Sequence, residues 1–104
     1  MHPAVLELKQ QLLDRYGDRL VRFIVFGSYV RGENTPESDI DVFVTLKGTV
    51  DRQIEDEIFG IYFSIELERD VVLDVKTFSE EDIQNTILGA IPLVENVLKE
   101  GIPV

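Results

Sequence analysis

A glycine–serine pair followed by an arginine is the first group of residues that could bind a ligand. Gly27 and Ser28 come directly after the apolar segment 20–26, and Arg31 follows three positions later. If a strand ends and a helix begins there, the first backbone N–H groups of the helix lack partners and attract anions. A serine hydroxyl can donate to a phosphate oxygen, and an arginine can donate two parallel hydrogen bonds. The pattern indicates a phosphate-binding turn.

Two aspartates two positions apart could bind a metal ion. Asp39 and Asp41 open the alternating segment DIDVFVTL at 39–46. Residues i and i+2 of a strand project from the same face, so both carboxylates should lie a few ångströms apart. Like charges at that separation repel each other unless a cation lies between them. Mg²⁺ prefers hard oxygen ligands together with a substrate phosphate, so we expect Asp39 and Asp41 to bind Mg²⁺.

A third carboxylate lies in the next predicted strand. Asp74 is flanked by apolar residues in VVLDVKT, and burying an unpaired carboxylate is costly. A metal shared with Asp39 and Asp41 would offset that cost. Three carboxylates around two Mg²⁺ ions can support in-line displacement at phosphorus. Lys76 could contact a phosphate, but the pattern favours a lysine that faces solvent.

Hydrophobic periodicity predicts which elements position these residues. Alternation places Ile40, Val42, Val44 and Leu46 on the core face of their strand, opposite the aspartates. We expect Ser28 to cap a short helix. We expect Ser79 to precede a helix near 80–88, where the acidic residues that begin at Glu80 suit the helix dipole. We expect helices at 4–16, 51–69, 80–88 and 92–100, a short helix from Gly27-Ser28 with a turn at Gly32, Asn34 and Pro36, strands at 20–26, 39–46 and 71–78, and a possible short fourth strand at 101–104.

This order of elements predicts an α/β (α+β) fold, with a small sheet and helices packed mainly on one face. A chain of 104 residues suggests one domain over 1–104. Asp plus Glu total 20 and Lys plus Arg total 10, and a net charge of −10 argues against direct binding to nucleic acid. The lack of cysteine excludes disulfides and thiolate chemistry, and the single histidine, His2, excludes a histidine-based zinc site. No apolar run spans a membrane and no signal peptide is recognised, so we expect a cytoplasmic protein.

The motif over 27–41, G-S-x-x-R-G-x5-S-D-I-D, resembles the nucleotidyltransferase fold of the DNA polymerase β superfamily. The small size is similar to that of the minimal nucleotidyltransferase (MNT) proteins. This resemblance implies a small mixed sheet, with Gly27 and Ser28 holding the β- and γ-phosphates of a nucleotide and Arg31 assisting. It also implies that Asp39 and Asp41 are catalytic metal ligands. Asp74 would match the third carboxylate, which acts on the attacking hydroxyl.

The resemblance also implies an activity and a partner. Members of the superfamily use Mg²⁺ and a nucleoside triphosphate, transfer a nucleoside monophosphate and release pyrophosphate. MNT proteins are typically encoded beside a HEPN-domain toxin, for which they act as antitoxins. The expected function is therefore Mg²⁺-dependent transfer of AMP from ATP to a hydroxyl on a HEPN-type toxin, with two Mg²⁺ ions.

Other interpretations remain open at this stage. The chain could be an idle antitoxin that neutralises its partner by masking it, which its acidic charge would favour if the partner surface is basic. Transfer to a small molecule such as an aminoglycoside is a third hypothesis. Taken singly, Gly27-Ser28 could be an ordinary turn, Arg31 could pair with Glu33 or Glu37, and the aspartates could border a solvated strand. The sequence leaves open the acceptor, the preferred base, the number of nucleotides transferred, the oligomeric state and the activity of the isolated chain.

Overall fold

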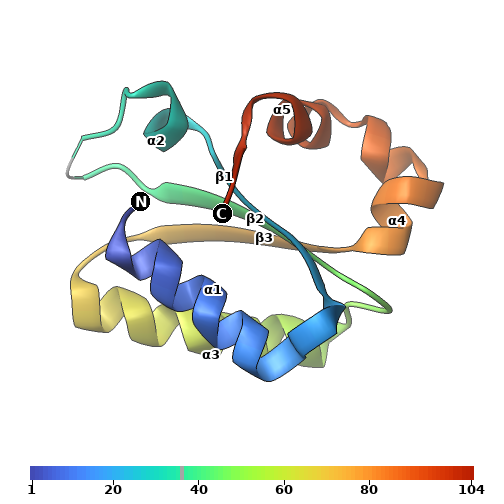
Figure 1. The fold of residues 1–104 in the computed structure, drawn as a ribbon, viewed down its shortest axis with the longest axis horizontal. Coiled ribbons are helices and arrows are strands. Elements are labelled where there is room, and N and C mark those ends of the chain that lie inside the picture. Colours follow the sequence, from blue (N-terminus) through green and yellow to red (C-terminus); the bar gives the residue numbers. More distant parts are fainter. Residues whose placement is uncertain (36) are drawn as a thin grey trace.

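The structure, a computed structural model, describes residues 1–35 and 37–104 and consists of one mixed sheet with helices on both faces (Figure 1). Pro36, part of the predicted turn, lies outside the described residues. The strands are β1 (Leu20–Phe26), β2 (Ile40–Leu46), β3 (Leu73–Ser79) and β4 (Ile102–Pro103). The helices are α1 (Pro3–Tyr16), α2 (Ser28–Arg31), α3 (Arg52–Arg69), α4 (Glu80–Asn85) and α5 (Pro92–Glu100), with 3₁₀ turns η1 (Gly17–Arg19) and η2 (Ile87–Ala90).

The sheet has the strand order β3-β2-β1-β4. β1 pairs antiparallel with β2 and with β4, whereas β2 pairs parallel with β3. Because α3 connects β2 to β3, both of these strands start at the same end of the sheet, and β1 ends there. The register places Asp41 opposite Asp74 on one side and opposite Phe26 on the other.

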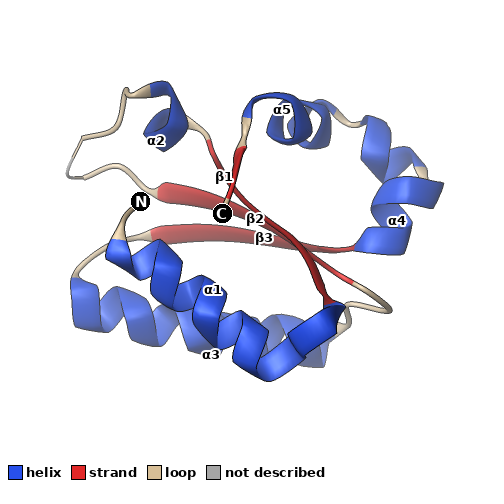
Figure 2. Ribbon diagram, in the orientation of Figure 1, coloured by secondary structure: helices blue, strands red, loops and turns tan. Residues whose placement is uncertain are grey.

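The two faces of the sheet are covered by different helices (Figure 2). α1 and α3 pack on the face that carries Val42 and Val44, and form the larger of two buried cores. α4 and α5 pack on the opposite face, where the smaller core consists of Ile24, Phe43, Ile83, Val94 and Val97. The predicted fold class is confirmed. The two longest helices, α1 and α3, lie on one face, and the predicted helices at 80–88 and 92–100, observed as α4 and α5, lie on the other.

Most predicted elements are present, with small changes at their ends. The short strand at the C-terminal end is β4, and Val104 N donates to Phe23 O at 3.0 Å beyond it. The predicted helix at 80–88 is shorter, because α4 ends at Asn85 and a 3₁₀ turn follows. The α3 helix begins where Asp51 Oδ1 accepts a hydrogen bond from Ile54 N at 2.9 Å, which caps its first turn. Across the described part of the chain, no helix has both the length and the apolar character needed to cross a membrane.

Candidate active site

Gly27 brings the predicted phosphate-binding turn against a predicted metal ligand. It follows β1 with φ 76°, a conformation that favours glycine, and its carbonyl accepts hydrogen bonds from Val30 N and Arg31 N at 3.1 and 3.2 Å. A Cβ atom at this position would lie 2.2 Å from Asp41 Oδ2. Glycine is therefore required twice here, for the backbone turn and for the close approach of the Asp41 carboxylate.

Asp41 and Asp74 lie side by side on adjacent parallel strands. Both are half-buried, and they face the side of the sheet away from α1 and α3. Lys76 Nζ is 3.1 Å from Asp74 Oδ1 and 3.2 Å from Oδ2, so the expectation that Lys76 simply faces solvent is wrong. Burial raises the pKa of Asp41, and the neighbouring Asp74 charge raises it further, against the opposing effect of Lys76. The site thus holds more negative charge than one lysine offsets.

Asp39 lies outside this pair. It is exposed, immediately before β2, and its charge has a smaller effect on the Asp41 pKa than the charge of Asp74. Within residues 1–35 and 37–104, no three carboxylate or histidine side chains are gathered closely enough to form a metal site as they stand. The structure therefore brings together Asp41 and Asp74 and leaves Asp39 at their margin. Hard oxygen ligands and uncompensated negative charge fit a divalent cation.

Ser28 and Arg31 form the two ends of the four-residue helix α2. Gly27 occupies the N-cap position and no side chain caps the helix, so the predicted capping role of Ser28 is wrong and Ser28 is instead the first helical residue. Arg31 Nε lies 3.3 Å from Glu33 Oε1, and both side chains are exposed. An exposed pair of this kind contributes little to stability, so Arg31 can exchange Glu33 for another anion at small cost.

A cavity of about 230 Å³ adjoins the turn. It lies between α2 and α5, and Phe26, Val30 and Leu93 supply its apolar walls. Gly27 and Arg31 also line it, so the cavity is continuous with the candidate phosphate-binding residues. Its walls could not be recognised from the sequence, because they carry the same residue types as the core.

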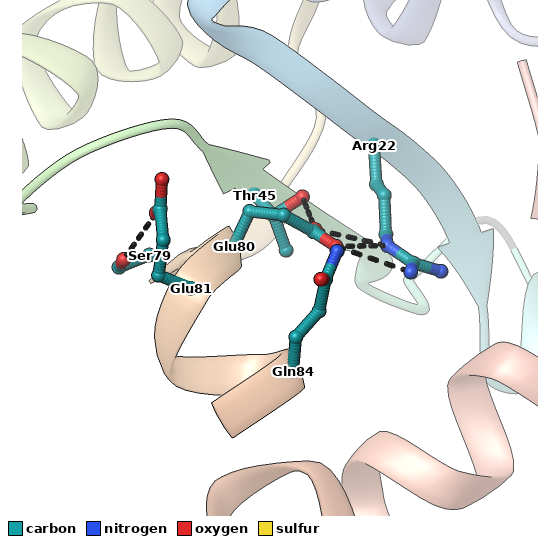
Figure 3. A network of polar contacts seen from close by, with 6 residues as sticks. All are labelled: Arg22, Thr45, Ser79, Glu80, Glu81 and Gln84. Carbon is teal, nitrogen blue, oxygen red and sulfur yellow. Dashed lines mark hydrogen bonds and ion pairs between the residues drawn. The ribbon is translucent and has the colours of Figure 1, made fainter. Parts of the chain in front are cut away.

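A second polar cluster, on the same face of the sheet, connects α4 to β1 and β2 (Figure 3). The side chain of Glu80 is buried and accepts hydrogen bonds from Arg22 Nε at 3.0 Å, Thr45 Oγ1 at 2.7 Å and Gln84 Nε2 at 2.6 Å. Burial alone would raise the pKa of Glu80, but these donors outweigh it and the pKa is lowered. Glu80 does lie in the first turn of α4, as expected, and the structure adds that its side chain is buried among these donors.

Comparison with known proteins identifies the family. The sequence model of the nucleotidyltransferase domain matches residues 5–102. The chain belongs to the nucleotidyltransferase domain family. This confirms the resemblance found in the motif at 27–41, and the chain is a nucleotidyltransferase.

Relatives of this nucleotidyltransferase cover nearly its whole length. A Methanocaldococcus jannaschii protein named "Putative protein adenylyltransferase MJ0604" is 35% identical over 98 residues, which are 94% of this chain and 91% of the relative. A solved structure described as a putative minimal nucleotidyltransferase is 30% identical, with a TM-score of 0.59 over 97% of this chain and 86% of the other. A toxin–antitoxin crystal structure with AMP-PNP has a TM-score of 0.62 over 92% of this chain and 68% of that one, and its 22% identity supports the fold alone.

Substituting Gly27 tests whether the turn and the carboxylate depend on each other. Gly27→Ala should lower nucleotidyl transfer about a hundredfold, because a displacement near 1 Å at a reacting centre has an effect of that order. The melting temperature should also fall, since the added Cβ enters a left-handed backbone conformation.

Gly48→Ala is the matched control. Gly48 has a φ of 83°, but its Cβ would meet Arg19 Nη2 at an ordinary 3.5 Å, far from the aspartates. It should show the backbone strain without the loss of transfer. Equal activity in the two variants, measured by single-turnover kinetics, would show that the approach of Gly27 to Asp41 is not needed.

Proposed function

We propose that this nucleotidyltransferase transfers AMP from ATP, in the presence of Mg²⁺, to a hydroxyl on a HEPN-type partner protein, and that it acts as the antitoxin of that partner. The observation that carries the proposal is the close approach of Gly27 to Asp41, with Asp74 in register beside it. The name of the M. jannaschii relative supports protein as the acceptor. A Shewanella oneidensis complex of an MNT antitoxin with a tri-AMPylated HEPN toxin shares the fold, with a TM-score of 0.52 at 20% identity over 96% of this chain and 70% of that chain, and suggests the partner.

The geometry suggests a role for each residue around the turn. The backbone of Gly27 and the Ser28 hydroxyl would hold the β- and γ-phosphates, and Arg31 would leave Glu33 to donate to them. The nucleoside would enter the cavity between α2 and α5, where Phe26 and Leu93 offer apolar contacts to a base. The open side of the Asp41–Asp74 pair would then face the α-phosphate.

The transfer itself is a displacement at the α-phosphorus. The acceptor hydroxyl oxygen forms a bond to phosphorus, the bond to the bridging oxygen of the β-phosphate breaks, and pyrophosphate leaves. Asp74 would receive the proton of the attacking hydroxyl, with Lys76 holding its carboxylate in place. Asp39, Asp41 and Asp74 would hold Mg²⁺, with two ions expected. When bound, Mg²⁺ would neutralise negative charge on the triphosphate.

The test is incubation of the purified chain with α-³²P-ATP and Mg²⁺, with and without the candidate partner, which is the protein encoded by the neighbouring gene. Label should appear on the partner only when both proteins, ATP and Mg²⁺ are present, and γ-³²P-ATP should give no label. A partner that stays unlabelled under these conditions contradicts AMP transfer.

Masking is the second candidate function, and the net charge of −10 favours it. The two functions separate in a variant with Asn at positions 39, 41 and 74. Under the proposed function this triple variant fails to protect cells from the toxin. Full protection by the triple variant, together with co-purification of the two proteins, would establish masking in its place.

A further inference from the structure

The outer face of α3 carries a row of exposed apolar side chains that the fold does not use. Phe59, Phe63 and Leu67, here called the α3 stripe, recur every four residues and are 50%, 45% and 70% exposed. The opposite side of the same helix buries Ile58 and Ile65 in the core. The helix thus has two apolar faces, of which one is covered by this chain. The rings of Phe59 and Phe63 stack with centroids 5.4 Å apart, so the stripe forms a continuous surface.

Gly60, in the middle of α3, is not explained by packing inside the chain. A Cβ at this position would meet nothing within 4 Å, and the residue is exposed. Glycine in a helix interior is unfavourable relative to alanine, so an open position would ordinarily favour alanine. A glycine three residues before Phe63 lets the surface of another molecule approach the helix backbone closely. This observation is independent of the exposed stripe and points to the same face.

The stripe borders the candidate active site through β3, the edge strand beside α3. Phe59 and Tyr62 line a hollow together with Val75 and Thr77 of β3. Burial raises the pKa of Tyr62, and the charges of Glu66 and Asp74 raise it further. Asp74 faces the other side of the sheet from α3, so a protein seated on the stripe reaches Asp74 only by extending around the edge strand β3.

The charge around the stripe indicates what kind of protein fits. The two basic residues of α3 are already engaged, Arg52 with Asp56 at 3.9 Å and Arg69 with Glu7 at 2.9 Å. The remaining charges of the helix are acidic and include exposed Glu55, Glu68 and the following Asp70. A second copy of this chain, with a net charge of −10, would place an acidic border against an acidic border.

We propose that the α3 stripe docks a different protein, which presents an apolar centre surrounded by lysine and arginine, and that docking there brings its acceptor hydroxyl to Asp74. The position of the acceptor rests on the proposed function, whereas docking itself does not. The stripe supplies the buried centre of the contact and the acidic border supplies orientation.

The experiment measures binding of the same candidate partner, the purified protein encoded by the neighbouring gene, by isothermal titration calorimetry without ATP. Phe63→Ser combined with Leu67→Ser should weaken binding at least tenfold. The control is Leu6→Ser combined with Leu13→Ser on α1, where the side chains are 50% and 39% exposed, and it should bind as the unmodified chain does. Because all four side chains are exposed, both variants should keep the melting temperature of the unmodified chain within a few degrees.

Gly60→Ala gives a second test, in which the stability of the isolated chain and the affinity for the partner should change in opposite directions. In the isolated chain it should raise the melting temperature by roughly 4 °C, since alanine favours the helix. In the complex it should weaken binding, because the added methyl group separates the two surfaces. A glycine without a docking role would give the gain in stability and unchanged binding, and this would overturn the inference.

The remaining outcomes separate docking from chemistry. Equal binding by the stripe variant and the α1 control, or no binding by the unmodified chain, overturns docking on α3. A chain that is dimeric in sedimentation analysis and becomes monomeric in the stripe variant assigns the stripe to a second copy and also overturns the proposal. Loss of binding in the stripe variant, with no transfer of label by the unmodified chain, supports docking and rejects the proposed function.

Discussion

Replacing Asp39 and Asp41 together with Asn should lower AMP transfer roughly a thousandfold or more, because it removes two carboxylates of the proposed metal site. The same substitution should leave the melting temperature unchanged or slightly higher. Burial and the Asp74 charge raise the pKa of Asp41, so the charged form of Asp41 is disfavoured in the folded chain. Neutral Asn removes this repulsion. A loss of activity without a loss of stability distinguishes a functional carboxylate from a structural one.

The control removes two charges elsewhere. Asp14 and Asp18 are exposed near the C-terminal end of α1, away from the loop that carries Asp39 (Figure 1). Asn at both positions gives the same change in net charge and should leave single-turnover transfer within about twofold. Undiminished labelling of the partner by the Asp39/Asp41 variant would reject metal-assisted transfer at this site.

Among the substitutions proposed here, Glu80→Ala should give the largest loss of stability, about 2–3 kcal/mol in the free energy of unfolding. The change leaves the hydroxyl of Thr45, which is fully buried, without the carboxylate it contacts at 2.7 Å, and it releases Arg22. Because the Arg22 side chain is about one-third exposed, water can replace part of its ion pair, so we expect less than the full cost of breaking a buried pair. Urea titration measures the difference, and Glu95→Ala, an exposed change on α5, should stay within 0.5 kcal/mol as an order-of-magnitude limit.

The dependence on pH identifies the Glu80 charge as the cause. The pKa of Glu80 is lowered in the folded chain, so its charge stabilises the fold above the unfolded pKa near 4.3, as an approximate reference. That contribution is lost as the pH falls through the lowered folded pKa. The difference in stability between the unmodified chain and Glu80→Gln should therefore be full at neutral pH and shrink in acid. A difference that stays constant down to pH 3, taken as an approximate lower limit for the titration, would assign the effect to packing.

The faces of the strands were predictable because the alternation of side chains is local. In β2, the side chains of Ile40, Val42 and Val44 are buried in the core between the sheet and the helices α1 and α3. Asp41 faces the opposite side of the sheet, as the period of two requires. The strand-to-helix turn at Gly27 was predictable for the same reason. The register that places Asp41 opposite Asp74 was not, because it depends on how α3 returns the chain to the sheet.

Individual side-chain contacts explain where the structure departs from the expectations. Glu80 is one of three acidic residues in the first turn of its helix, as expected, but its contact with Arg22 could not be predicted because the two residues lie 58 positions apart. Lys76 and Asp74 are two residues apart on one strand, so their contact was visible in the pattern, yet an exposed lysine is the commoner outcome. The sequence predicts the same role for Asp39 and Asp41. In the structure only Asp41 lies directly against the backbone of Gly27.

The unequal size of the two cores has a consequence for local unfolding. The larger core joins α1 and α3 to the sheet, whereas the layer of α4 and α5 rests on the smaller core and on the Glu80 contacts. Amide hydrogens in α4 and α5 should therefore exchange with solvent through partial opening, at a lower free energy than those of β2 and α1. Since α5 forms a wall of the cavity beside Gly27, the layer that we expect to open at the lower free energy also borders the proposed nucleotide site.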